Sequence, residues 1–275
     1  LHARSSFSFL RGASHPQDLI QRAAELNYNS IAILDHMGVY GSVQAHLAAR
    51  RNGIRALVGA TVELPGRHLG GSYLEIPLLV DSTKGYQNLC HLLTEIHCCS
   101  GVFSPDALSN NSEPSVFFPS HTEGIIALLT PESLPSLDRK TLLRVALMLG
   151  RTFGKQNVYI TLTRHHNRST DRINRLLIDL AQSLKIPLLA SNAPLFSHRR
   201  CRLLADCFTC LRHHTTLDDA GTLLASNSER YLKSPDQMSA LFGDQQQALI
   251  NTEILSERLA FTLDNLEYQF PSYHE

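Results

Sequence analysis

Strand-like and helix-like patterns alternate along most of this chain, and this alternation limits its fold more than any other feature of the sequence. The helix-like stretches are Gln17–Leu26, Gly41–Arg51, Lys84–Ile96, Arg139–Leu149 and Thr170–Leu184. The strand-like runs are Ser30–Leu34, Ile54–Leu64, Glu75–Val80, Gly124–Leu129, Asn157–Thr163 and Pro187–Ala190. Such alternation predicts an α/β fold, in which helices cover a mostly parallel sheet.

Local signals mark where several of these elements begin and end. Ser14 stands before the first helix as an N-cap-like residue, and Asn52-Gly53 is a good C-cap pair for the second. The glycine-rich stretch from 66 to 71 lacks the Gly-Lys-Ser/Thr order of a phosphate-binding P-loop, so we expect a hairpin turn. Ser104–Ser120, within 98–123, is rich in Ser, Asn and Pro and predicts an irregular excursion.

Length and composition exclude several classes of protein. A chain of 275 residues can form one large domain, and α/β barrels commonly reach ~250 residues. No apolar run reaches the ~20 residues that span a bilayer, so we expect a cytoplasmic protein without a membrane partner. The formal net charge is zero, which is atypical of a free-standing nucleic-acid binder. Six cysteines are too few for a secreted disulfide scaffold and predict reduced thiols.

A series of motifs resembles one known family in the family's order. The motifs are Leu1–Leu10, Arg11–Pro16, Ile31–His36, Leu57–Ala60, Thr122–Leu129, Arg212–Asp218 and Glu229–Pro235. Together they resemble the PHP (polymerase and histidinol phosphatase) domain, closest to the error-prone, DnaE-like branch of bacterial DNA polymerase III alpha subunits.

The resemblance implies a PHP-type distorted (β/α)7 barrel over residues 1–198, followed by a helical remainder over 199–275 that packs on the barrel. Phe261–Pro271 resembles the junction to a polymerase module, which the chain does not contain. The chain also lacks an initiating Met, so we expect it to be a piece of something longer.

A PHP domain holds up to three metal ions, typically zinc or manganese, on imidazoles and carboxylates at the ends of its strands. The resemblance places His2, Asp35, His36 and His165 at retained ligand positions. Four positions have lost their ligands, namely Arg4, Thr61, Ala193 and Leu195. Glu63 lies two residues after Thr61 and could share its strand face, but its register differs from the family's, which disfavours it as a substitute ligand; His97 is a further candidate.

This ligand count favours a degenerate site without metal. In that interpretation His2, Asp35, His36 and His165 form hydrogen bonds across the barrel mouth, and Arg4 compensates the charge of Asp35. A residual site for one zinc or manganese ion is the second interpretation. An active multi-metal esterase is the third, and it requires ligands that the sequence lacks.

Two further clusters have weaker claims. Cys207 and Cys210 with His213 and His214 have zinc-like spacing, but a helix over Leu203–Arg212 would place the two thiols against a core. We therefore expect buried thiols. His198, with the arginines at 199, 200, 202 and 212, forms a basic cluster that could face DNA or a partner, although a solvated helix face is the simpler interpretation.

The resemblance implies the N-terminal PHP domain of an error-prone DNA polymerase, which synthesises DNA across lesions during damage tolerance and DNA repair. Its substrates would be deoxynucleoside triphosphates and primed template DNA, with magnesium at polymerase carboxylates outside this chain. The domain itself would brace the polymerase module and other damage-tolerance components. Two alternatives stay open: a metal-dependent phosphoesterase or 3'-5' proofreading exonuclease, and a free-standing interaction module.

Overall fold

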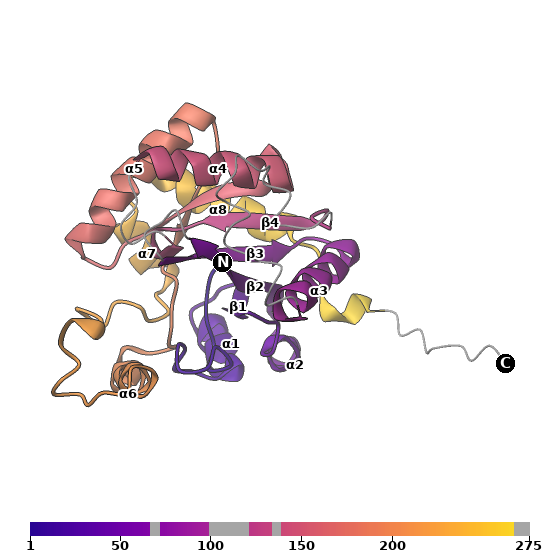
Figure 1. Cartoon of the computed structure of the whole chain (residues 1–275). Helices are drawn as coiled ribbons and strands as arrows, with labels where there is room; N and C mark the ends of the chain where they lie inside the picture. The colour runs from indigo at the N-terminus through magenta and orange to yellow at the C-terminus, as the bar shows by residue number, and fades with distance from the viewer. Residues whose placement is uncertain (67–71, 99–120, 134–138, 267–275) are drawn as a thin grey trace.

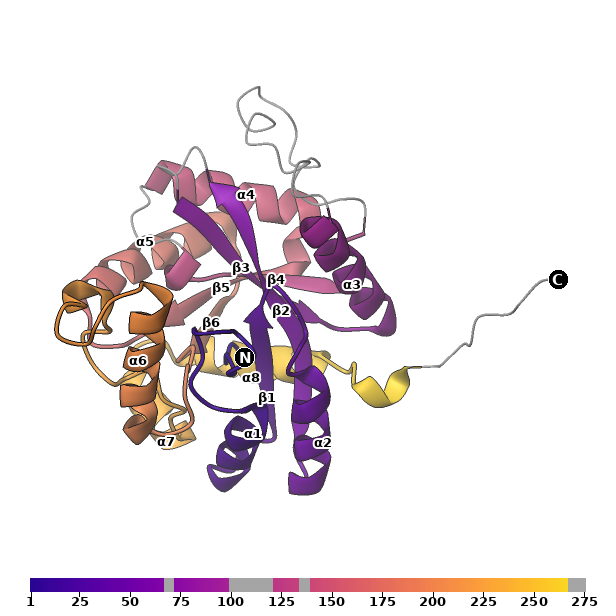
Figure 2. The same cartoon turned by 60° about the horizontal axis from the view of Figure 1, so that its bottom comes forward.

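The computed structural model describes residues 1–66, 72–98, 121–133 and 139–266. Six strands form one sheet in the order β1-β2-β3-β4-β5-β6, and the sheet curls into a half-barrel (Figures 1 and 2). The fold class is therefore α/β, as predicted. The expected excursion at Ser104–Ser120 lies outside the described residues, as do 67–71 in the expected turn.

The elements follow the predicted order closely. The strands are β1 (Ser30–His36), β2 (Arg55–Gly66), β3 (Ser72–Val80), β4 (Ile125–Leu129), β5 (Val158–Thr163) and β6 (Leu188–Ser191). The helices of the first two thirds of the chain are α1 (Pro16–Glu25), α2 (Ser42–Asn52), α3 (Thr83–Cys98), α4 (Arg139–Phe153) and α5 (Arg168–Leu184). Three helices follow, α6 (Arg202–Arg212), α7 (Pro235–Leu241) and α8 (Gln246–Arg258).

Two helix ends test the predicted caps. Gly53 ends α2 in the left-handed conformation at φ 68°, which confirms the predicted C-cap. The N-cap of α1 is His15 rather than Ser14, because the Asp18 carboxylate accepts the backbone N–H of His15. The Ser14 hydroxyl pairs with the hydroxyl of Ser197 instead.

The sheet mixes parallel and antiparallel pairs. β1 and β2 are parallel, as are β4, β5 and β6. β3 runs antiparallel to both of its neighbours, and the pairing of β2 with β3 continues from Gly59–Leu79 to Gly66–Ser72. This register is that of a hairpin centred on the glycine-rich stretch, as the sequence predicts.

The N-terminal residues pair with β1 through a single bridge between Ala3 and Ile33. Ala3 exchanges two backbone hydrogen bonds with β1, to Ala32 and from Leu34, and the Arg4 amide donates to the carbonyl of Pro194 beyond β6. These residues thus lie between the first and last strands, where a closing strand would run. The chain turns away from the sheet at Ser5 into a loop, in which the backbone N–H of Ser6 donates to the carbonyl of Ser14.

Alternation along the strands divides the core between the two faces of the sheet. The outer face packs against α3, α4 and α5 through residues such as Val58, Ile125 and Leu177. The inner face carries Leu34, Ile126 and their neighbours, which pack with Leu255 of α8. Of the helices after β6, α8 therefore packs on the half-barrel.

α6 is far less embedded than these helices. Only Cys210 of α6 is buried, whereas Leu203 and Leu211 expose 64% and 60% of their surface. In Figure 1 the helix stands at the edge of the molecule, away from α4 and α5. Within the described residues, no helix is both long enough and apolar enough to cross a membrane.

Candidate active site

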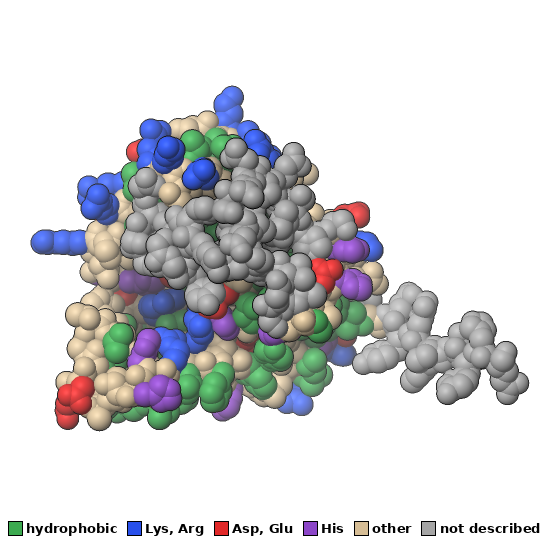
Figure 3. Space-filling view, in the orientation of Figure 1, with side chains coloured by type: hydrophobic (Ala, Val, Ile, Leu, Met, Phe, Trp, Pro, Cys, Tyr) green, Lys and Arg blue, Asp and Glu red, His purple; other side chains and the backbone are tan. Residues whose placement is uncertain are grey.

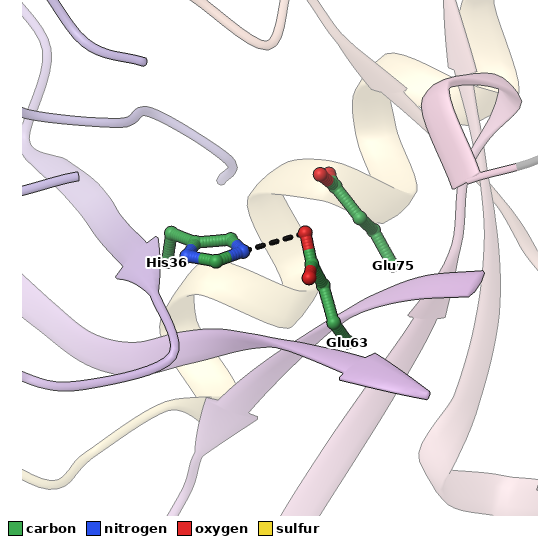
Figure 4. Close-up of side chains that lie close together, drawn as sticks. All are labelled: His36, Glu63 and Glu75. Atoms are coloured by element: carbon green, nitrogen blue, oxygen red, sulfur yellow. Dashed lines mark ion pairs between the residues drawn. The ribbon is translucent and has the colours of Figure 1, made fainter. Parts of the chain in front are cut away.

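Three side chains meet where β1 and β2 end and β3 begins. His36 is the last residue of β1, and Glu63 and Glu75 lie directly opposite each other on β2 and β3 (Figure 4). Two carboxylates opposite each other on one face of a hairpin repel. The pair therefore requires positive charge nearby.

The trio has the spacing of a metal site. One ligand atom from each of His36, Glu63 and Glu75 lies within 4.8 Å of the others, and it is the only such group among the residues that the structure describes. His36 Nε2 is 2.6 Å from Glu63 Oε1, but the geometry is not that of an aligned hydrogen bond.

Two arginines supply the positive charge that the carboxylates require. The Arg4 guanidinium forms an ion pair with Glu75, and their side chains are only 9% and 18% exposed. Arg11 bridges the two acids, at 3.1 Å from Glu75 Oε1 and 3.0 Å from Glu63 Oε1. Both carboxylates are therefore already neutralised by side chains of the N-terminal segment.

These contacts lower the pKa of both carboxyls. For Glu63, the contact with His36 lowers the pKa most, and the charges of Arg11 and Arg4 add to the effect. For Glu75, burial has the largest single influence and would raise the pKa, but Arg4 and Arg11 together lower it below its usual value. Both groups are carboxylates at neutral pH.

His2 is buried two residues before Arg4, and neither of its ring nitrogens has a hydrogen-bond partner. Burial lowers the pKa of His2 well below its usual value, and the charges of Arg4 and Arg230 lower it further. His2 is thus a neutral imidazole facing cations. A metal dication at this point would meet the same repulsion from both arginines.

Asp35 does not take part in the cluster, although it directly precedes His36. Adjacent residues of a strand point to opposite faces, and Asp35 points toward the N-terminal loop. Its carboxylate accepts hydrogen bonds from the Ser5 backbone N–H and from the hydroxyls of Ser5 and Ser8, all at 2.8–2.9 Å. The predicted pairing of Arg4 with Asp35 is therefore wrong, since serines satisfy Asp35 and Arg4 pairs with Glu75.

The other predicted site residues are distributed around the barrel mouth. His165 Nε2 lies 2.8 Å from the carbonyl oxygen of Asn192, and burial lowers its pKa. Thr61 donates its hydroxyl hydrogen to the carbonyl of Leu34, and the Ala193 carbonyl accepts from Arg230. Leu195 lines a cavity at the mouth. None of these four lies in the described trio.

The remaining candidates do not converge on a metal site either. His97 Nε2 lies 2.7 Å from the carbonyl oxygen of Met37 and is exposed. Cys210 is buried and Cys207 is half-buried, both as free thiols, and His213 and His214 are exposed. The structure thus brings no zinc-type cluster together from these residues within the described chain.

The donor set of the trio fits a divalent metal poorly as it stands. An imidazole and two carboxylates are suitable ligands for zinc or manganese. Here both carboxylates are engaged by guanidinium groups, so an ion would have to displace Arg4 and Arg11 from Glu75. The two arginines balance the negative charges of Glu63 and Glu75 without a metal.

Sequence reasoning overlooked Glu75 and Arg11 and undervalued Glu63. The signal was available, because a hairpin centred on the glycine-rich stretch places Glu63 opposite Glu75. Like charges in that position need a counter-charge, and Arg4 and Arg11 are the nearest cations in the preceding motif. The strand pairing in the hairpin identifies Glu63, Glu75 and their arginines, whereas comparison with the family's ligand positions does not.

The fold and the cluster define a class: a curled α/β half-barrel with histidine and carboxylate side chains at the ends of its strands. The model of the PHP domain family matches residues 1–165. This chain therefore belongs to the PHP domain family.

Relatives extend the similarity to nearly the whole chain. An error-prone DNA polymerase from Anaeromyxobacter dehalogenans (strain 2CP-1) is 31% identical over 272 residues, which cover 98% of this chain and 23% of that protein. An error-prone DNA polymerase from Pseudomonas aeruginosa is 32% identical over 273 residues, which cover 98% and 24%. The chain thus spans about a quarter of the length of these relatives. Among solved structures, an amidohydrolase from Chromobacterium violaceum with bound sulfate and no metal aligns at a TM-score of 0.46 and 17% identity, over 69% of this chain and 84% of that one.

Proposed function

We propose that this chain is the PHP region of an error-prone DNA polymerase, and that its own role is to brace the polymerase rather than to hydrolyse a substrate. Similarity to error-prone polymerases over 98% of the chain supports the first part. DNA-directed DNA synthesis across lesions would then be the activity of the whole protein, in the bacterial cytoplasm. Deoxynucleoside triphosphates, primed template DNA and magnesium would belong to its polymerase module.

The ion pair between Arg4 and Glu75 carries the second part of the proposal. A guanidinium forms fixed, directional contacts with carboxylates and stays protonated in proteins. A divalent metal would compete directly with this contact for Glu75 and, through Arg11, for Glu63. In this degenerate site Arg4 thus takes the place of a metal ion as the counter-charge of Glu75. The ion pair also holds the N-terminal segment on the sheet.

A second candidate function rests on the spacing of His36, Glu63 and Glu75. If the arginines moved aside, these three groups could hold a zinc or manganese ion for a phosphoesterase or 3'-5' exonuclease. Such an ion would supply a hydroxide nucleophile and stabilise charge on a phosphoryl oxygen. The residues of this chain would then position the ion through one imidazole and two carboxylates.

The two candidates differ in what His36→Ala does to the intact polymerase. A bracing domain predicts that primer extension is retained and that no metal-dependent removal of 3'-terminal nucleotides occurs in either wild type or variant. The assay uses end-labelled primed DNA with added zinc or manganese and without nucleotides. Exonuclease turnover that wild type shows and His36→Ala loses would instead establish the hydrolytic function.

A further inference from the structure

A small cavity lies at the barrel mouth between the sheet and α6. Its volume is about 240 Å³, which is below the ~300 Å³ at which pockets for larger organic ligands begin. Five arginines and three carboxylates are among its described lining residues: Arg4, Arg11, Arg202, Arg212, Arg230, Glu75, Glu132 and Asp206. We name it the arginine cavity. In Figure 3, blue Lys and Arg side chains gather in the hollow above the position of α6.

One face of α6 forms a wall of this cavity. Arg202, Asp206, Thr209 and Arg212 follow helical spacing and line the space, whereas Leu203 and Leu211 point outward. The charged face of α6 is thus turned toward the protein and part of its apolar face toward solvent. This differs from an ordinary surface helix, whose charged face is turned toward solvent.

Two of the arginines lack an acidic partner. Arg4, Arg11 and Arg202 form ion pairs with Glu75 or Asp206. Arg230 instead donates from Nε and Nη2 to the carbonyl of Ala193, at 3.2 and 3.1 Å. Arg212 has a side-chain contact with its neighbour His213. Within the described residues, no carboxylate oxygen lies within 4.0 Å of either guanidinium.

Arg212 and Arg230 each lie near other cations of the cavity, which repel them. Partial burial lowers the pKa of Arg212, and the charges of Arg11 and Arg4 lower it further, whereas Glu75 and Glu63 raise it. Burial also lowers the pKa of Arg230, where Glu132 and Glu75 raise it and Arg4 lowers it. A multivalent anion between the walls would remove this repulsion and accept several N–H donors at once.

We propose that the arginine cavity binds a phosphate-type oxyanion through Arg212 and Arg230, without a metal, and that the anion fastens α6 to the half-barrel. The excess of arginine over carboxylate favours an anion, and the size of the cavity favours a single phosphate group. Guanidinium forks match the geometry of phosphate oxygens. This inference does not depend on the bracing role, because hydrolysis and polymerase activity play no part in it.

The test is thermal unfolding of the full chain in inorganic phosphate at constant ionic strength, with chloride as the balancing salt and a chelator present. We expect a saturable rise in melting temperature at millimolar phosphate. Phosphate also stabilises proteins generally, but that effect rises without saturation. Only the saturable component counts as binding at the site.

Two variants assign the site. Arg212→Gln should abolish the saturable rise, whereas Arg200→Gln, at an exposed arginine of the same segment outside the cavity, should keep it. Because Arg212 is exposed, its substitution leaves the fold intact. Hydrogen exchange should show that phosphate protects α6 in wild type but not in Arg212→Gln.

Either a wild type with no saturable rise, or an equal rise in Arg212→Gln, would overturn the proposal. A second arm distinguishes the source of the phosphate group. A nucleoside 5'-monophosphate that competes with phosphate would support a group carried on a nucleotide, and failure to compete would support free phosphate. Each outcome is independent of metal content and of DNA synthesis, so failure here would not affect the proposed function.

Discussion

Replacing Asp35 by alanine should destabilise the protein by about 4 kcal/mol, the largest effect that we expect from a single substitution. The variant leaves the Ser5 amide and the hydroxyls of Ser5 and Ser8 without their buried acceptor, and hydrogen bonds to a charged group contribute about 1.5–3 kcal/mol each. Ser8 also accepts the backbone N–H of His36, so the strand end is loosened as well. Denaturant unfolding monitored by circular dichroism measures the change.

Two matched variants separate the hydrogen bonds from other effects of the Asp35 substitution. Asp35→Asn keeps the shape of the side chain but turns an amide N–H2 donor toward the serine donors. We therefore expect an intermediate loss of about 2 kcal/mol in the free energy of unfolding. Asp179→Asn alters an exposed acid on α5 and should change stability by less than about 0.5 kcal/mol. If Asp35→Ala unfolds with the same free energy as Asp179→Asn, the hydrogen bonds from the serines to Asp35 do not stabilise the fold.

Replacing Glu75 by alanine should cost about 3 kcal/mol. The substitution strands the Arg4 guanidinium, of which only 9% is exposed, and removal of one partner from a buried ion pair costs about 3–5 kcal/mol. Arg11 is more exposed and can turn to solvent, which places the expectation at the lower end of that range. Thermal unfolding should show a decrease in melting temperature of several degrees.

A double substitution shows whether the stranded charge causes this loss. Arg4→Met with Glu75→Leu replaces both charges by apolar side chains of similar length, and such replacements are often neutral. We therefore expect the double variant to be more stable than Glu75→Ala. A double variant as unstable as the single one would mean that Glu75 acts through packing and not through Arg4.

The sequence predicted the order and approximate limits of the strands and helices well, because the periodicity of apolar residues reports directly which faces are buried. His36 was also correctly placed at the mouth. The pairing of charges was not predicted correctly. Position in the family's motif suggested Arg4 with Asp35, whereas the strand places Asp35 and His36 on opposite faces.

Charge pairing depends on contacts between segments that are remote in the sequence, and these are hard to read from one chain. Glu75 is 71 residues from Arg4, and only the register of the β2–β3 hairpin brings it beside Glu63. The serines that satisfy Asp35 come from the N-terminal loop that follows Arg4. No local sequence pattern predicts that this loop contacts Asp35.

Metal content tests the central claim, that Arg4 and Arg11 replace metal at the carboxylates of Glu63 and Glu75. The full chain is purified without chelator, equilibrated with zinc or manganese, dialysed, and analysed by plasma mass spectrometry beside Arg4→His, which supplies an imidazole and releases Glu75. We predict far less than one ion per chain in wild type and more in Arg4→His. One or more tightly bound ions per wild-type chain, lost on His36→Ala, would contradict the account.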